Sequence, residues 1–81
     1  MPVILRIENI NFLFFSNEGN PLELCHIHVR RNTDLAKFWL VPTVILADNY
    51  GFSSQELNKI KKMVTENREL FIQKWNEYFN L

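Results

Sequence analysis

Two histidines separated by a single residue, His26 and His28, are the side chains of this sequence best suited to chemistry. They lie in the run HIHVRR, whose alternating apolar and polar residues are typical of a β-strand. Because successive side chains of a strand point to opposite faces, both imidazoles and Arg30 are expected on one face, with Ile27 and Val29 on the other. Imidazoles two residues apart along a strand are spaced by ~6.6 Å and can flank a phosphate as general base and general acid.

The following strand is expected to bring two more functional side chains beside the histidines. Burial of the alternate residues in the run AKFWL places Lys37 and Trp39 on the histidine side of the sheet. A connecting loop at residues 31–34 then sets His28 opposite Lys37. The same register sets His26 opposite Trp39.

Metal-independent RNA cleavage is the chemistry that this set of side chains predicts. One imidazole would be neutral and the other protonated near pH 7, and a neighbouring cation would stabilise the phosphorane. Three cations, Arg30, Arg31 and Lys37, against one nearby carboxylate give a local formal charge of +2, which suits an anion such as phosphate. We predict catalytic roles for His26, His28 and Lys37, and binding roles for Arg30, Arg31 and Trp39.

Two other interpretations of the histidine face remain open at the level of the sequence. A His-x-His pair on the solvent side of a small sheet is also a common polar surface pattern without chemistry. A metal site would need more ligands than two imidazoles, since Cys25 points to the other face and no nearby carboxylate has ligand spacing. We therefore expect no metal and no other cofactor, and we expect Cys25 to be a small core residue rather than a nucleophile.

Length, charge and cysteine content limit the classes of protein to consider. The 81 residues are expected to form a single domain, residues 1–81. Nine basic and nine acidic side chains leave no net charge to draw the chain onto nucleic acid or a membrane, so an RNA site would have to be local. No apolar run approaches the ~20 residues of a membrane span. A single cysteine and the absence of a signal-peptide pattern predict a cytoplasmic protein without a membrane role.

The hydrophobic periodicity changes from two residues to about 3.6 after Ser53, which predicts strands followed by helix. Ser53 and Glu56 have the spacing of a capping box at the helix start. A helix unbroken to its end would be longer than a five-stranded sheet is wide, so we expect a bend or a split at residues 65–67. The predicted fold class is α+β: an antiparallel meander of four or five strands with a C-terminal helix, or two, packed on one face. The strands are expected at residues 3–7, 10–15, 24–30, 36–41 and 44–47, with a turn at 16–21.

Several segments, in order along the whole chain, resemble one known family. They are MPVILRI, FLFFSNEGNP, HIHVRR, AKFWLVP, the GFS before EL, and ENRELFIQKWNEYF. Together they resemble the small bacterial domain-of-unknown-function family four-one-six-zero. The resemblance implies a toxin-side component of a two-gene toxin–antitoxin module, encoded beside a partner of domain-of-unknown-function family two-four-four-two. It implies a cognate antitoxin-like protein as partner and carries over no catalytic residue.

Two functional hypotheses from different classes follow from these observations. In the first, the chain is a toxin-like component of a type II toxin–antitoxin module that acts as a ribonuclease, or binds RNA or phosphate, through the His-x-His face. In the alternative, the same face is a non-catalytic surface of a protein-binding or regulatory module. That surface would contact a partner protein or a second copy in a homodimer.

Overall fold

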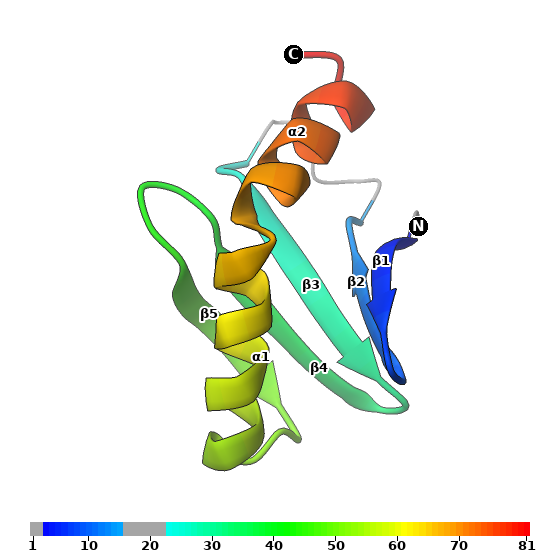
Figure 1. Cartoon of the computed structure of the whole chain (residues 1–81), viewed down its shortest axis with the longest axis vertical. Helices are drawn as coiled ribbons and strands as arrows, with labels where there is room; N and C mark the ends of the chain where they lie inside the picture. The colour runs from blue at the N-terminus through cyan, green and yellow to red at the C-terminus, as the bar shows by residue number, and fades with distance from the viewer. Residues whose placement is uncertain (1–2, 16–22) are drawn as a thin grey trace.

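The structure is a computed structural model that describes residues 3–15 and 23–81, and it confirms the α+β class. Five strands come first and two helices follow, as Figure 1 shows. The turn expected at residues 16–21 lies outside the described residues. The elements are β1 (Val3–Ile7), β2 (Ile10–Leu13), β3 (His26–Arg31), β4 (Asp34–Trp39), β5 (Ile45–Tyr50), α1 (Ser54–Glu66) and α2 (Arg68–Tyr78).

The sheet is an antiparallel meander in which each strand pairs with its neighbour in the sequence, in the order β1-β2-β3-β4-β5. The β3–β4 connection is shorter than expected, because Arg31 pairs with Asp34 and only two residues turn the chain. Asn32 takes a φ of 54° in that turn, a left-handed conformation that asparagine tolerates better than most residues. β5 also differs from the expectation: it begins at Ile45 and continues through polar residues to Tyr50.

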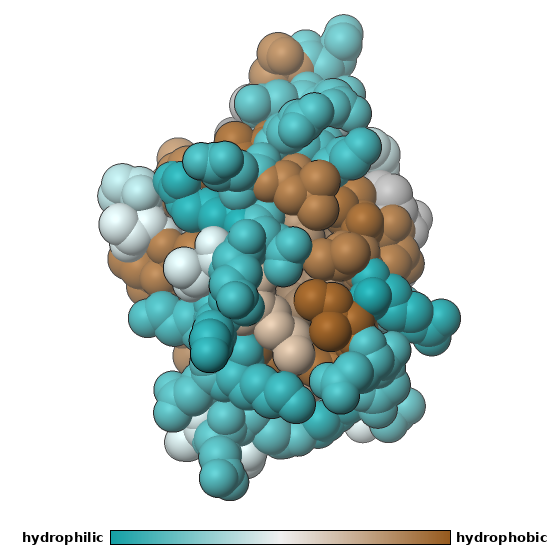
Figure 2. Space-filling model, viewed as in Figure 1, coloured by the Kyte–Doolittle hydropathy of each residue, from teal (hydrophilic) through white to brown (hydrophobic). Residues whose placement is uncertain are grey.

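Both helices cover the same face of the sheet (Figure 1), and the hydrophobic core lies between these two layers. Alternate residues of β3 and β4 supply the sheet side of the core, as the sequence predicts, and Phe12 of β2 stacks on Phe71 of α2 with 5.4 Å between ring centroids. Each fully buried aliphatic or aromatic side chain contributes roughly 1.5–3 kcal/mol to folding. Figure 2 shows hydrophilic side chains along much of the outer side of the helices, with hydrophobic surface beside them.

The helical segment is split at Asn67, within the expected interval of residues 65–67. Asn67 has φ −109° and ψ 14°, and its side-chain amide donates a hydrogen bond of 2.9 Å to the Met63 carbonyl. Arg68, the first residue of α2, donates hydrogen bonds to the carbonyls of Leu40 (2.7 Å) and Pro42 (3.2 Å). The break therefore lets α2 attach to the β4–β5 connection. Among the described residues, no helix is long and apolar enough to cross a membrane.

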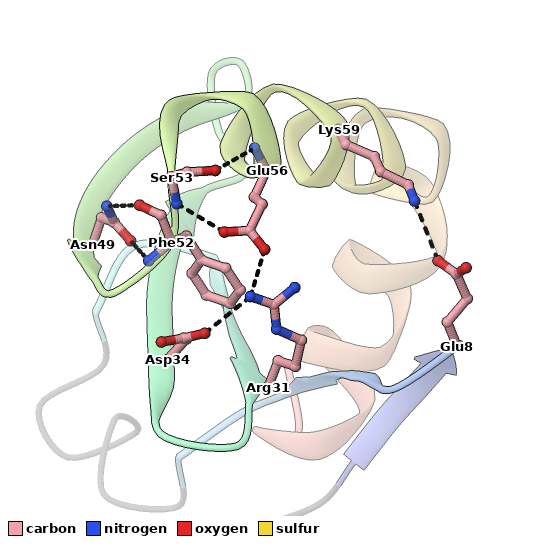
Figure 3. A network of polar contacts seen from close by, with 8 residues as sticks. All are labelled: Glu8, Arg31, Asp34, Asn49, Phe52, Ser53, Glu56 and Lys59. Atoms are coloured by element: carbon pink, nitrogen blue, oxygen red, sulfur yellow. Dashed lines mark hydrogen bonds and ion pairs between the residues drawn. The ribbon is translucent and has the colours of Figure 1, made fainter.

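A polar network fixes the start of α1 against the sheet (Figure 3). The expected capping box is present: Ser53 Oγ accepts from the backbone N–H of Glu56 at 3.1 Å, and the Ser53 N–H donates to Glu56 Oε1 at 2.9 Å. The other carboxylate oxygen of Glu56 contacts the Arg31 guanidinium, which also pairs with Asp34 at 3.0 Å. The Ser53 N–H first, and the Arg31 guanidinium second, lower the pKa of the Glu56 carboxyl below its usual value of 4.5.

This pKa shift predicts an acid-sensitive contribution to stability. A carboxyl whose pKa is lower in the folded chain stabilises the fold above its unfolded pKa, and this contribution is lost as the pH falls through the folded pKa. We expect Glu56→Gln to lower the free energy of unfolding at pH 7, with a difference from the unsubstituted chain that shrinks below about pH 4.5. Urea unfolding at a series of pH values measures it. Glu66→Gln, at the other end of α1, is the control, and an equal effect of both substitutions would contradict the prediction.

Candidate functional site

The predicted register of the histidine strand is confirmed. In the β3–β4 pairing His28 lies opposite Lys37, and His26 lies opposite Trp39. Ile27 and Val29 of β3 face the helices and are fully buried, so the two imidazoles belong to the opposite side of the sheet. We call this side, which faces away from α1 and α2, the distal face.

The sequence predicts both imidazoles on the side of the sheet that the helices leave uncovered, but both rings are buried. His26 is 0% exposed and His28 is 6% exposed. Aromatic packing is part of the cause: Phe15 stacks on His28 with 3.7 Å between centroids and an interplanar angle of 13°, and Trp39 meets His26 edge-on at 5.4 Å. The sequence places the rings on the correct side, but it does not reveal how large neighbouring rings close over them.

His26 is held by both layers of the fold. Its ring centroid lies 4.9 Å from that of Trp75 in α2, which passes over the start of β3 (Figure 1). Its Nδ1 is 2.6 Å from the Leu24 carbonyl, and because a carbonyl only accepts, Nδ1 is the donor. In the neutral ring the proton therefore sits on Nδ1 and the lone pair on Nε2. A fully buried ring is not in reach of a substrate in this conformation, and His26 is packed into the structure beneath the distal face.

Arg31 lies on the other side of the sheet from the histidines, contrary to the local charge balance expected from the sequence. It shares the side of Ile27, places its guanidinium 5.2 Å from the centroid of the Phe52 ring, and pairs with Asp34 and Glu56. Its place two residues beyond Val29, in the last position of β3, explains this orientation. Arg30, in contrast, stays on the histidine side, opposite Leu35.

A cavity of about 270 Å³ opens on the distal face beside His28 and Lys37. We call it the distal pocket. Aromatic and aliphatic side chains make most of its wall, and one cation and one carboxylate lie opposite each other on β4 and β5. Such a mixture of apolar walls with a few polar groups is usual for binding sites. The lining residues are Phe15, His28, Leu35, Ala36, Lys37, Asp48 and Tyr50.

The charges around the distal pocket largely balance. The ammonium of Lys37 is 3.4 Å from a carboxylate oxygen of Glu23 and lies 4.4 Å from the centroid of the Trp39 ring. Asp48 is its cross-strand neighbour on β5. Among the described residues that line the pocket, the one cation, Lys37, and the one carboxylate, Asp48, offset each other, so the pocket itself lacks the excess positive charge that attracts a nucleic-acid backbone.

Cys25 is not an activated nucleophile. Its half-buried side chain packs against the core, and burial raises the pKa of the thiol to about 11, although Arg68 lowers it in part. The thiolate population near neutral pH is accordingly very small. Within residues 3–15 and 23–81, no group of three or more His, Cys, Asp and Glu side chains is placed to hold a metal ion.

A family model described as domain of unknown function (DUF4160) matches residues 9–76. The chain belongs to the DUF4160 family. The match supports the resemblance read from the sequence, and its description assigns no activity. No curated protein and no solved structure matches the chain significantly. The matched part of this DUF4160 chain runs from the turn before β2 into α2, and it includes every residue that lines the distal pocket.

Five lining residues of this DUF4160 pocket were not predicted as site residues from the sequence: Phe15, Leu35, Ala36, Asp48 and Tyr50. The expected fourth strand began at residue 36 and the expected fifth ended at residue 47, so three of them, Leu35, Asp48 and Tyr50, lay outside any predicted element. A register shift between the pairs made by Lys37 and Phe38 interrupts the alternation along β5. Leu35 could have been found, because it lies two residues before Lys37 and so on the same side of β4.

The burial of His26 predicts that its loss harms the fold. We expect His26→Ala to lower the free energy of unfolding by about 2–4 kcal/mol, because it removes a ring packed among aromatic side chains together with its hydrogen bond. Urea unfolding at pH 7 measures the change. Lys61→Ala, on the exposed side of α1, is the control and should stay within about 0.5 kcal/mol of the unsubstituted chain. If His26→Ala lowers the free energy of unfolding no more than Lys61→Ala does, the structural role of His26 is contradicted.

Proposed function

We propose that this DUF4160 chain is a protein-binding component of a bacterial two-gene toxin–antitoxin module. Its distal face recognises a cognate antitoxin-like protein. The observation that carries the proposal is the distal pocket, where the largely exposed side chain of Tyr50 (65%) stands beside a charge-balanced pair, Lys37 and Asp48. An accessible tyrosine next to a concave, largely apolar wall is typical of a residue that dominates the energy of a protein interface.

The geometry of the two imidazoles favours this non-catalytic function over RNA cleavage by a histidine pair. General acid–base catalysis needs both rings within hydrogen-bond reach of the reacting phosphate. His26 is fully buried against Trp75 and Trp39, and His28 is covered on one side by Phe15. In this arrangement the histidines build the floor of a recognition surface.

The partner is the protein that the family resemblance implies, a product of the neighbouring gene from domain-of-unknown-function family two-four-four-two. A balanced but charged pocket suits a protein surface that offers an apolar side chain flanked by hydrogen-bonding groups. Lys37 can donate to partner carbonyls or carboxylates, and Asp48 can accept from partner amides or cations. The proposal therefore places specificity in β4 and β5 rather than in the helices.

Co-purification of the two gene products tests this proposal. We expect Tyr50→Ala to weaken the complex by at least about tenfold in the dissociation constant, because truncation of a central interface tyrosine typically costs ~2 kcal/mol. Titration calorimetry measures the constant. Tyr78→Ala is the matched control, since Tyr78 is 41% exposed but belongs to α2 on the other side of the sheet. A complex weakened as much at Tyr78, or unchanged at Tyr50, would place the interface elsewhere.

A second candidate function is binding or cleavage of RNA at the distal pocket. Its support is that His28 and Lys37, both predicted from the sequence, line one cavity. A single imidazole with a lysine can bind a phosphate and exchange a proton with it. In this RNA hypothesis only His28 contacts the phosphate, and His26 remains packed beneath the pocket.

Growth after induced expression separates the RNA hypothesis from simple partner binding. If the chain acts on RNA, induction without its partner arrests growth, and His28→Gln and Lys37→Met each relieve the arrest because they remove the proton-exchanging group or the cation. Lys59→Met, on α1, is the control for charge and should leave the arrest unchanged. Circular dichroism checks that every variant folds. Arrest that persists in both folded pocket variants would exclude chemistry at this site.

A further inference from the structure

β5 forms one edge of the sheet, and the bulge between Leu46 and Asp48 is one of the few features it carries that protect an edge strand. The sheet order ends at β5, so within the described part of the chain its outer backbone N–H and C=O groups have no strand beside them. An edge of this kind is a template for another strand. β5 contains no Lys or Pro, its one charged residue is Asp48, and Ile45 and Tyr50 near its ends are 50% and 65% exposed.

Along β5, side chains point to the two faces of the sheet in the same order from either end of the strand. Ile45 and Tyr50 lie opposite Trp39 and Leu35 of β4, on the distal face. Inside them, Leu46 and Asn49 lie opposite Phe38 and Ala36, which belong to the core beneath the helices. A register shift lies between the pairs made by Leu46 and Asp48, in the middle of β5. The strand is therefore self-complementary about its own centre.

We infer that a second copy of this chain pairs with β5, antiparallel and about a two-fold axis, to give one continuous ten-stranded sheet. Symmetry then sets Ile45 opposite the partner's Tyr50, and Leu46 opposite the partner's Asn49. Each residue meets one that points to the same face, as an antiparallel ladder requires, whereas a shift by one residue would oppose residues from different faces. The pairing is isologous, so it closes as a dimer and leaves no further β5 edge.

The side-chain contacts across this junction favour a second copy as the occupant. An aliphatic side chain faces an aromatic one at each end, and this pair occurs twice by symmetry. On the helix side, a groove of about 270 Å³ between α1 and β5 is lined by Phe38, Leu46 and Leu57 among others. The dimer brings the two grooves together at the junction and covers their apolar lining. Each Asp48 keeps its own cross-strand cation, Lys37, beside it.

This inference goes beyond the proposed function, because it concerns the outer edge of β5 and needs no antitoxin. Sedimentation of the isolated chain over a range of concentrations tests it. We expect a monomer–dimer equilibrium, and we expect Ile45→Lys to weaken the dimer at least tenfold, because a lysine at a sheet edge opposes strand pairing. Val3→Lys is the matched control: Val3 is 51% exposed on β1, the strand at the opposite edge, and its substitution should leave the equilibrium unchanged.

Engineered cysteines test the register. In a Cys25→Ser background, Ile45→Cys combined with Tyr50→Cys should give a covalent dimer on mild oxidation with diamide, since opposed Cα atoms ~4.5–5.5 Å apart suit a disulfide. The two cysteines of one chain are ~17 Å apart along the strand and cannot join each other. Each single variant alone should stay monomeric on a denaturing gel, because residue 45 does not face its own copy, and a mixture of the two should cross-link.

Three outcomes would overturn the inference. The first is that the chain sediments as a monomer at every concentration. The second is that Val3→Lys weakens the dimer and Ile45→Lys does not. The third is that a single cysteine variant cross-links as well as the double variant. Failure of the proposed function looks different. In that case Tyr50→Ala leaves antitoxin binding intact, while Ile45→Lys still shifts the sedimentation equilibrium.

Discussion

The alternation of side chains along β3 is the constraint on which both faces of the sheet depend. Ile27 and Val29 are fully buried beneath the helices, so His26 and His28 must point to the distal face. A slip of one residue would bring the imidazoles into the apolar core, where an unpaired polar group costs roughly 2–7 kcal/mol. The same alternation turns Arg31 toward α1, where it joins the helix cap to the end of the sheet.

Aromatic packing decides what the histidine face can do. Rings from β4, from α2 and from Phe15 after β2 pack around the imidazoles, so the pair that resembles a catalytic site lies buried beneath the proposed recognition surface. Lys37 is a cation at the surface above these rings, and it is balanced by Glu23 and Asp48. Charge balance and an accessible tyrosine favour a protein partner over a polyanion.

Because the helices form a single layer, they cover only one side of the sheet in this small domain. The helix side is used for the core, and the bend at Asn67 lets the two short helices follow the sheet while Arg68 fastens α2 to the β4–β5 connection. The distal face and the outer edge of β5 are the surfaces to which we assign the proposed contacts with other chains. These two surfaces are adjacent and share Tyr50, so occupancy of one affects the space available at the other.

The sequence by itself determined the fold class, the strand order, the capped helix start and the register that sets His28 opposite Lys37, because these follow from local periodicity and spacing. Only the tertiary structure decided that His26 is buried and that Asp48 and Tyr50 complete the pocket. Burial depends on side chains distant in the sequence, such as Trp75, and the irregular pairing of β5 leaves no regular pattern to read. Periodicity identifies the side of a strand, whereas exposure is set by what packs against it.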